Sequence, residues 1–174
     1  HGPGQRVGLS LGGGGTIAPV CRDGRCITEH ERGILRANLV IGCSDVGIYL
    51  NSAARSSVVD NTLLDTAGID VRYATSSARL DGNLVDGPIR SRDSGLLHLD
   101  DNRSTALWQM FAGYHPVRSL FVEAGSGDLA WRGGVPERDA SAVGGIDLCG
   151  AKRGRSATYG AFDDFSGCLA RQGR

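Results

Sequence analysis

The chain has 174 residues, enough for one domain with a sizeable core, and its 40% hydrophobic and 22% charged residues exclude a disordered or membrane-embedded chain. Nineteen basic and nineteen acidic residues give a net charge of zero, so the composition predicts neither nucleic-acid binding nor attraction to an anionic membrane. The 27 glycines, with only 5 prolines and 6% aromatic residues, favour many short strands joined by turns.

The start of the chain is less regular than the rest. Residues 6–11 alternate like a strand, and Gly12–Gly15 is a loop without the Lys-Ser/Thr of a phosphate-binding loop. Nothing before Val7 is typical of a solenoid cap or a signal peptide, so we expect the natural protein to extend further toward its N-terminus. The expected organisation is an irregular start with one coil, a set of coils, and a C-terminal cap and tail, over residues 1–32, 33–104 and 105–174.

Five cysteines allow two disulfides. An Asp-Gly turn between Cys21 and Cys26 would bring their sulfurs together in a short hairpin, although two free buried thiols fit the same spacing. A second pair, Cys149 with Cys168, would tie down the tail and leave Cys43 unpaired. A bridge favours an oxidising compartment, secreted or periplasmic. The sequence has no CxxC or HxxxH pattern, so it predicts no metal site and no cofactor.

A repeat of about twenty residues runs through the middle of the chain. Its clearest mark is an asparagine with an aliphatic residue three positions before it. The asparagines are Asn38, Asn61, Asn83 and Asn102, and the aliphatic residues are Leu35, Val58, Leu80 and Leu99. A second aliphatic residue follows the first three asparagines by two positions, and a Gly-Ile motif recurs in step, beginning at Gly47, Gly68 and, more loosely, Gly87.

Each repeat holds two or three short strands and no helix long enough to cross a sheet, which excludes a βαβ fold. Such strands bury their inward side chains only when one coil stacks on the next. We therefore predict an all-β fold, a right-handed parallel β-helix (solenoid) with an irregular Gly-rich C-terminal tail. The aliphatic residues would form an inner column, and the asparagines would form a hydrogen-bonded ladder at a left-handed bend.

These repeats resemble those of pectate-lyase-like right-handed parallel β-helix proteins, in which N-x-hydrophobic, G-I-x-hydrophobic and hydrophobic-x-x-N recur. The likeness covers residues 31–104. In the tail, residues 119–129 look like the segment that follows the last coil in bacterial members, and residues 147–162 are similar to their terminal signature. The resemblance implies the C-terminal part of a bacterial β-helix protein, in a family whose enzymes generally act on polysaccharides.

An outer sheet face is the expected place for a polysaccharide. With Ile48, Ile69 and Ile89 inward, the outward side chains are the candidate substrate-binding residues Tyr49, Asn51, Asp70, Arg72, Arg90 and Arg92. Because arginine binds carboxylates through two parallel hydrogen bonds and tyrosine stacks on sugar rings, they suit an acidic polysaccharide or oligosaccharide. The alternative is a solvated sheet surface on which the aspartate pairs with a neighbouring arginine.

No catalytic residue is assigned. A glycosidase needs two carboxylates at a defined separation, and most carboxylates of the coils are interpreted as turn residues, namely Asp45, Asp65, Asp81, Asp86 and Asp93. Lys152, the one lysine, lies in the tail, and no lyase motif is recognisable. The leading hypothesis is a polysaccharide-associated protein, the C-terminal part of an acidic-polysaccharide lyase or epimerase. The other is a non-enzymatic scaffold, accessory or adhesin-like module; both imply no nucleic acid and no membrane insertion, and both leave the substrate open.

Overall fold

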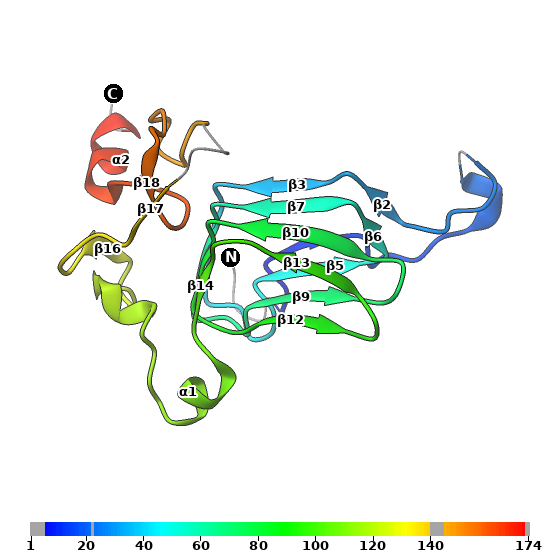
Figure 1. The fold of residues 1–174 in the computed structure, drawn as a ribbon, viewed down its shortest axis with the longest axis horizontal. Coiled ribbons are helices and arrows are strands. Elements are labelled where there is room, and N and C mark those ends of the chain that lie inside the picture. Colours follow the sequence, from blue (N-terminus) through cyan, green and yellow to red (C-terminus); the bar gives the residue numbers. More distant parts are fainter. Residues whose placement is uncertain (1–5, 22, 140–144, 173–174) are drawn as a thin grey trace.

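The computed structural model describes residues 6–21, 23–139 and 145–172. Its first part is a parallel β-solenoid built from three four-stranded sheets (Figure 1). The first sheet holds β1 (Leu9–Leu11), β5 (Ile48–Asn51), β9 (Ile69–Arg72) and β12 (Ile89–Arg92). The second holds β3 (Ile34–Arg36), β7 (Ser56–Val59), β10 (Ser77–Asp81) and β13 (Leu96–Leu99). The third holds β4 (Leu39–Ile41), β8 (Thr62–Leu64), β11 (Leu84–Val85) and β14 (Arg103–Ser104). The predicted fold class is confirmed.

The other elements are short. In the solenoid, β2 (His30–Glu31) pairs with β6 (Ala53–Ala54), and the 3-10 helix η1 (Ala18–Val20) lies in the connection after β1. After the last coil come α1 (Leu107–Phe111) and the 3-10 helix η2 (Arg118–Leu120). They are followed by β15 (Phe121–Glu123), β16 (Asp128–Trp131), β17 (Glu137–Asp139), β18 (Ser156–Thr158) and α2 (Phe165–Gln172). No helix in the described ranges is long and apolar enough to cross a membrane.

The predicted register is confirmed in all three sheets. In the second sheet the aliphatic column pairs Leu35 with Val58, Val58 with Leu80, and Leu80 with Leu99. Val58 and Leu80 are fully buried, as expected for inward side chains of a solenoid that is filled by residues from all three sheets. Leu99 is half exposed because it lies in the last coil.

The asparagine ladder is present, but its bend differs from the prediction. The Nδ2 groups of Asn38, Asn61 and Asn83 each donate to the Oδ1 of the next asparagine, at 2.8, 2.9 and 2.8 Å. The left-handed backbone lies one residue earlier, at Ala37 (φ 51°) and its equivalents in the next two coils, and not at the asparagines. The asparagine therefore supplies hydrogen bonds, while its predecessor makes the turn.

The long connection between β1 and β2 carries the disulfide Cys21–Cys26, which decides between the two alternatives for these cysteines. The glycine loop folds onto this connection: the backbone N–H groups of Gly13 and Gly15 donate to the Glu29 carboxylate at 2.6 and 3.0 Å. These N–H groups thus bind an anion that the chain itself supplies.

We call residues 121–139 and 145–172 the C-terminal lobe. It packs against the side of the third sheet, where Leu64 and Leu84 meet Phe121 and Phe162 in a second hydrophobic cluster. The predicted disulfide Cys149–Cys168 closes the lobe, and Cys43 is free and buried. The domain boundaries given above stay a prediction.

Candidate functional site

The six residues predicted to bind substrate lie on the outer face of the first sheet. The register pairs Tyr49 with Asp70, and Asp70 with Arg90, in one outward column. It pairs Asn51 with Arg72, and Arg72 with Arg92, in the next column. The inward neighbours of these residues on β5 and β9 are isoleucine, leucine and valine side chains of the core, and those on β12 are Ile89 and Ser91. The period of two residues therefore fixes which side chains face out.

Asp70 organises this face. Its side chain is only 1% exposed, because Arg90 and Arg92 cover it from the next coil. Arg90 Nε donates to Asp70 Oδ1 at 2.8 Å, and Arg92 Nη1 donates to Asp70 Oδ2 at 2.9 Å. The Asp70 hydrogen bond and charge raise the pKa of Arg92 above its ordinary value. An outward carboxylate has become the buried anchor of two cations.

Arg72 connects the outer face of the first sheet to the residues at the edge of that face. Its Nε hydrogen-bonds the Asp93 carboxylate and its Nη1 lies 3.4 Å from the hydroxyl of Tyr49. These bonds, that of Asp93 first, raise the pKa of Arg72. Its guanidinium also lies 4.7 Å from the ring centre of Tyr73, a partly exposed aromatic residue that the sequence reasoning missed. Tyr73 directly follows Arg72, which was the available signal.

We call Tyr49, Asn51, Asp70, Arg72, Arg90 and Arg92 the arginine face. Its three guanidinium groups meet two carboxylates, those of Asp70 and Asp93, and this leaves an excess of one positive charge. Arg90 uses only Nε in these contacts, and Arg92 uses only Nη1. Both side chains are partly exposed, so their other N–H groups are available to a further acceptor.

A second candidate surface lies on the outer face of the second sheet, and sequence reasoning missed it. Here Ser57, Arg79 and His98 stack in register beside a hollow of about 430 Å³ that Arg55 and Leu96 also line. Asp100 hydrogen-bonds Arg79 and lies 3.2 Å from His98 Nε2. Arg55 pairs with Glu31 in the same way. The charges of this surface are thus compensated by its own carboxylates.

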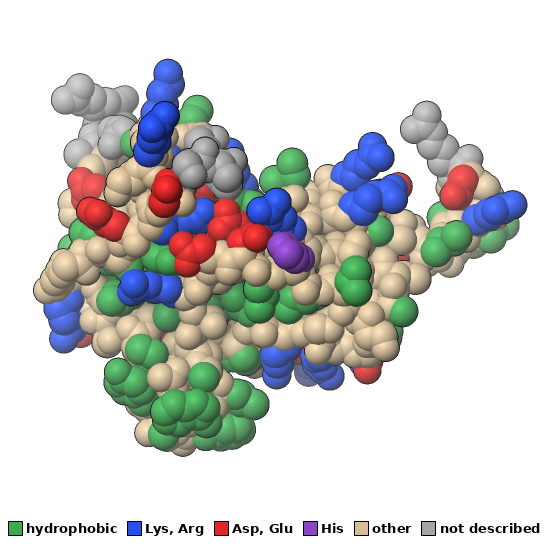
Figure 2. Space-filling model, viewed as in Figure 1, with side chains coloured by type: hydrophobic (Ala, Val, Ile, Leu, Met, Phe, Trp, Pro, Cys, Tyr) green, Lys and Arg blue, Asp and Glu red, His purple; other side chains and the backbone are tan. Residues whose placement is uncertain are grey.

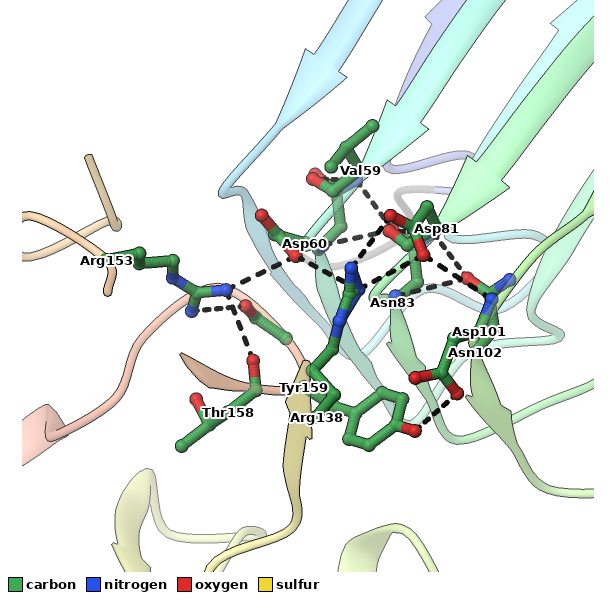
Figure 3. A network of polar contacts seen from close by, with 12 residues as sticks. Val59, Asp60, Asp81, Asn83, Asp101, Asn102, Arg138, Arg153, Thr158 and Tyr159 are labelled. Atoms are coloured by element: carbon green, nitrogen blue, oxygen red, sulfur yellow. Dashed lines mark hydrogen bonds and ion pairs between the residues drawn. The ribbon is translucent and has the colours of Figure 1, made fainter. Parts of the chain in front are cut away.

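Asp81, interpreted above as a turn residue, holds the C-terminal lobe together with Asp60 and Asp101 (Figure 3). Arg138 makes a two-pronged pair with Asp81, at 3.1 and 2.7 Å, and Arg153 Nη1 lies 3.3 Å from Asp60. Burial raises the pKa of Asp60, and the positive charges of Arg153, Arg138 and Arg36 only partly offset that effect. The hydroxyl of Tyr159 donates to Asp101. These carboxylates are occupied by the lobe.

Asp86 anchors the connection between solenoid and lobe. It is fully buried and accepts hydrogen bonds from Arg118 Nε at 2.9 Å, Arg118 Nη2 at 2.7 Å and Thr105 Oγ1 at 3.2 Å. The two Arg118 bonds go to Oδ2, whereas Nδ1 of His115 lies 2.9 Å from Oδ1, the oxygen that Thr105 also contacts. Burial raises the pKa of Asp86, but the hydrogen bonds from His115 and Arg118 outweigh burial and bring it below its ordinary value. Asp86 lies in the bend that follows β11, as predicted for a turn residue, and it is also a structural anchor.

Residues 17–109 match the model of a protein family described as "Periplasmic copper-binding protein (NosD)". The match covers more than half of the chain and all strands of the solenoid except β1. The chain belongs to the NosD family. No curated protein and no solved structure matches it. Membership in this periplasmic β-helix family agrees with the predicted secreted or periplasmic location.

The description of the NosD family names copper, so side chains able to ligate copper would be expected if this chain held a copper centre. Copper prefers thiolate, thioether and imidazole ligands. Four cysteines are bridged, and within the described ranges no group of three or more His, Cys, Asp or Glu side chains is placed to hold a metal ion. The described residues do not fit such a centre.

Proposed function

We propose that this NosD-family chain binds an acidic polysaccharide along the arginine face. The observation that carries the proposal is the clamp at Asp70, which holds the partly exposed Arg90 and Arg92 in register and leaves N–H groups of both without a hydrogen bond to another described residue. A carboxylate of the polymer would accept two parallel hydrogen bonds from a guanidinium group that is already oriented. Because the arginines are fixed before binding, little side-chain entropy is lost on association.

The strand spacing suits a polymer. Equivalent positions in neighbouring coils are about 4.8 Å apart, so the face presents donors at a regular rise along the solenoid axis. Tyr49 and Tyr73 lie at its edge, where their rings offer apolar surface to a sugar. The family description supports a periplasmic β-helix protein and leaves the ligand to experiment.

Affinity electrophoresis through gels containing alginate, pectate or chondroitin tests the proposal. We expect retention on at least one of these polymers, weakened severalfold by Arg92→Ala and by raised salt. Arg25→Ala, which removes an exposed arginine from the β1–β2 connection, is the matched control and should leave retention unchanged. Absence of retention on every acidic polymer would refute the binding proposal.

A second candidate is a non-enzymatic scaffold or adhesin-like module. It is favoured by the buried carboxylates Asp60, Asp81 and Asp86, which are engaged by arginines of the lobe and of the preceding connection. A lyase would generate an unsaturated uronate that absorbs in the near ultraviolet, so incubation with uronate polymers separates the two. Appearance of that absorbance would exclude the scaffold candidate and indicate a lyase that acts on the bound polymer.

A further inference from the structure

A loop that follows the last coil presents apolar side chains to solvent. We call residues 105–117 the α1 loop, because they carry α1 at their tip, and Figure 1 shows this tip beyond the last coil. Trp108 is 69% exposed and Phe111 is 85% exposed, and Leu107 and Tyr114 are also exposed. Figure 2 shows a protruding lobe of hydrophobic side chains at this place. An exposed apolar patch of this kind marks a surface that contacts another molecule or a membrane.

The base of the α1 loop is fixed to the body by buried groups. Thr105, at its start, donates from Oγ1 to Oδ1 of Asp86 at 3.2 Å. Arg118, directly after the loop, donates from Nε and Nη2 to Oδ2 of the same carboxylate, at 2.9 and 2.7 Å. Val117 is buried in the second hydrophobic cluster. Both limbs of the loop are therefore held in place, while the tip between them stays outside.

The tip of the α1 loop is held by its own hydrogen bonds. The backbone N–H of Ala106 donates to Oε1 of Gln109 at 2.8 Å, and that of Tyr114 donates to the carbonyl of Gln109 at 2.8 Å. The N–H of Ala112 donates to the carbonyl of Trp108 at 3.0 Å. A defined backbone thus carries the exposed rings, so little conformational entropy is lost when they meet a partner.

The composition of the α1 loop suits a lipid surface. No Asp, Glu, Lys or Arg occurs between Arg103 and Arg118. Trp108, Phe111 and Tyr114 are the three most exposed aromatic residues of the described chain. Tryptophan and tyrosine rings favour the interface between the apolar and the aqueous parts of a membrane, because they combine an apolar body with a polar group. The loop thus offers the side chains of such an interface and no acidic or basic group that would have to leave water.

The shape of the tip argues against a groove on a protein partner. A helix that binds in such a groove presents one apolar stripe over about two turns. The helix α1 has only five residues, and its apolar side chains do not form one stripe. Leu107 and Phe111 lie on the same side of the helix, whereas Trp108 lies about 100° around its axis. A tip that is apolar on more than one side is better covered by a fluid lipid surface.

Positive charge lies at the same end of the molecule. β12 is the last strand of the first sheet, and Figure 2 shows Lys or Arg side chains below it, near the hydrophobic lobe. The outward side chains of β12 are Arg90 and Arg92, which are 33% and 47% exposed. The arginine face to which they belong has an excess of one positive charge. An anionic lipid surface would therefore meet an apolar tip and positive charge together, an arrangement that the zero net charge of the whole chain does not reveal.

We propose that the α1 loop docks on the surface of a lipid membrane with anionic headgroups. Trp108, Phe111 and Tyr114 then lie at the level of the headgroups, and the arginines of β12 approach the lipid phosphates. The helix α1 is too short to cross a bilayer, so the contact is peripheral and the chain is not inserted through the membrane. The NosD family is periplasmic, and membranes bound the periplasm, so such a surface is within reach. This contact goes beyond glycan binding and does not depend on it.

Flotation of the whole chain with vesicles of phosphatidylcholine and phosphatidylglycerol tests the proposal. We expect the wild type to float with these vesicles and to bind less to vesicles of phosphatidylcholine alone. Phe111→Ser should weaken binding severalfold, because the exposed ring no longer reaches the lipid. Val20→Ser is the matched control, since Val20 is 80% exposed but lies in η1, and it should bind as the wild type does. Both positions are exposed, so the urea midpoints of the two variants should equal that of the wild type.

Tryptophan fluorescence gives a second measurement that leaves the α1 loop unchanged. The chain has two tryptophans, so Trp131→Phe leaves Trp108 as the single emitter and keeps an aromatic ring beside Phe121. The emission of Trp108 should shift to shorter wavelength when vesicles are added, because its ring leaves water. Lipids with brominated acyl chains should quench this emission.

Three results would overturn the proposal. The first is a wild type that floats with neither kind of vesicle. The second is binding to anionic vesicles with unchanged emission of Trp108, because that pattern belongs to a charge contact elsewhere on the chain. The third is self-association of the wild type that needs no lipid and is abolished by Phe111→Ser, without flotation, because a second copy would then cover the loop.

Discussion

The solenoid and the C-terminal lobe are held together by different kinds of contact. In the solenoid the same contacts recur from coil to coil: an aliphatic column, a Gly-Ile strand and an asparagine ladder. In the lobe each contact occurs once. The stacked rings of Phe121 and Trp131, 4.8 Å apart, the disulfide Cys149–Cys168 and the Arg138–Asp81 pair do not recur at a fixed spacing along the described chain.

This difference indicates on which contacts the free energy of unfolding depends most. A repeated contact is one of several, so losing one member leaves its neighbours in place, although each member is costly to remove. A single buried ion pair has no such support, and a charge left behind without its partner is strongly destabilising. The joint between the two regions therefore depends on a few residues, and substitutions there should have the largest effects.

Arg138→Ala should be the most damaging substitution. It leaves the buried carboxylate of Asp81 without its two-pronged partner and removes positive charge from beside Asp60. We expect the free energy of unfolding, measured by urea titration, to fall by about 3 to 5 kcal/mol. Arg155→Ala, at an exposed position of the same lobe, is the control. Equal effects of the two substitutions would mean that the lobe is not anchored through this pair.

Leu80→Ala tests the solenoid side of the comparison. Leu80 is fully buried between Val58 and Leu99 of the neighbouring coils, so its truncation should cost about 2 to 5 kcal/mol. Leu99→Ala removes the same side chain from the half-exposed last member of the column and should cost clearly less. Chemical denaturation of both variants measures the difference. A larger loss of unfolding free energy for Leu99→Ala than for Leu80→Ala would contradict the assignment of Leu80 to the buried middle of the column and of Leu99 to its exposed end.

The solenoid was predictable because its signals are local and repeated. The period of two residues within a strand fixes which side chains point inward, and the period of about twenty residues fixes which residue of the next coil lies beside each of them. Val58 and Leu80 lie where they were expected. The burial of Asp70 was not predictable from its period. Its column points outward, and only the arginines of the next coil cover it.

The lobe was less predictable because its contacts join distant parts of the sequence. Arg138 and Asp81 are 57 positions apart, and Ala161 donates its backbone N–H to Thr62 Oγ1 across 99 positions. The terminal signature includes Tyr159, but it does not indicate that Asp101 is the hydrogen-bond partner of this residue. Side chains that pair once, over such separations, leave no period to detect.

Acid should weaken the connection at Asp86. The pKa of this aspartate in the folded chain lies below its ordinary value of 3.8. Its ionised carboxylate therefore stabilises the folded chain at pH values above 3.8, and this stabilisation is lost as the pH falls through the pKa of the folded chain. As the pH is lowered from neutral to values below 3.8, the midpoint temperature of thermal unfolding should fall more steeply for the wild type than for Asp86→Asn. Parallel curves for the two proteins would show that Asp86 contributes nothing to the acid response.

Arg72→Ala should have the smallest effect on stability, because its bonds to Asp93 and Tyr49 lie at the solvent-exposed edge of the arginine face. We expect the urea midpoint to stay within error of the wild type, while retention on an acidic polysaccharide gel weakens. Arg79→Ala is a matched control, since Arg79 also pairs with one aspartate but lies on the second sheet. It should leave both measurements unchanged. Equal losses of retention from the two substitutions would indicate a general charge effect, and the glycan would then not be recognised by the first sheet.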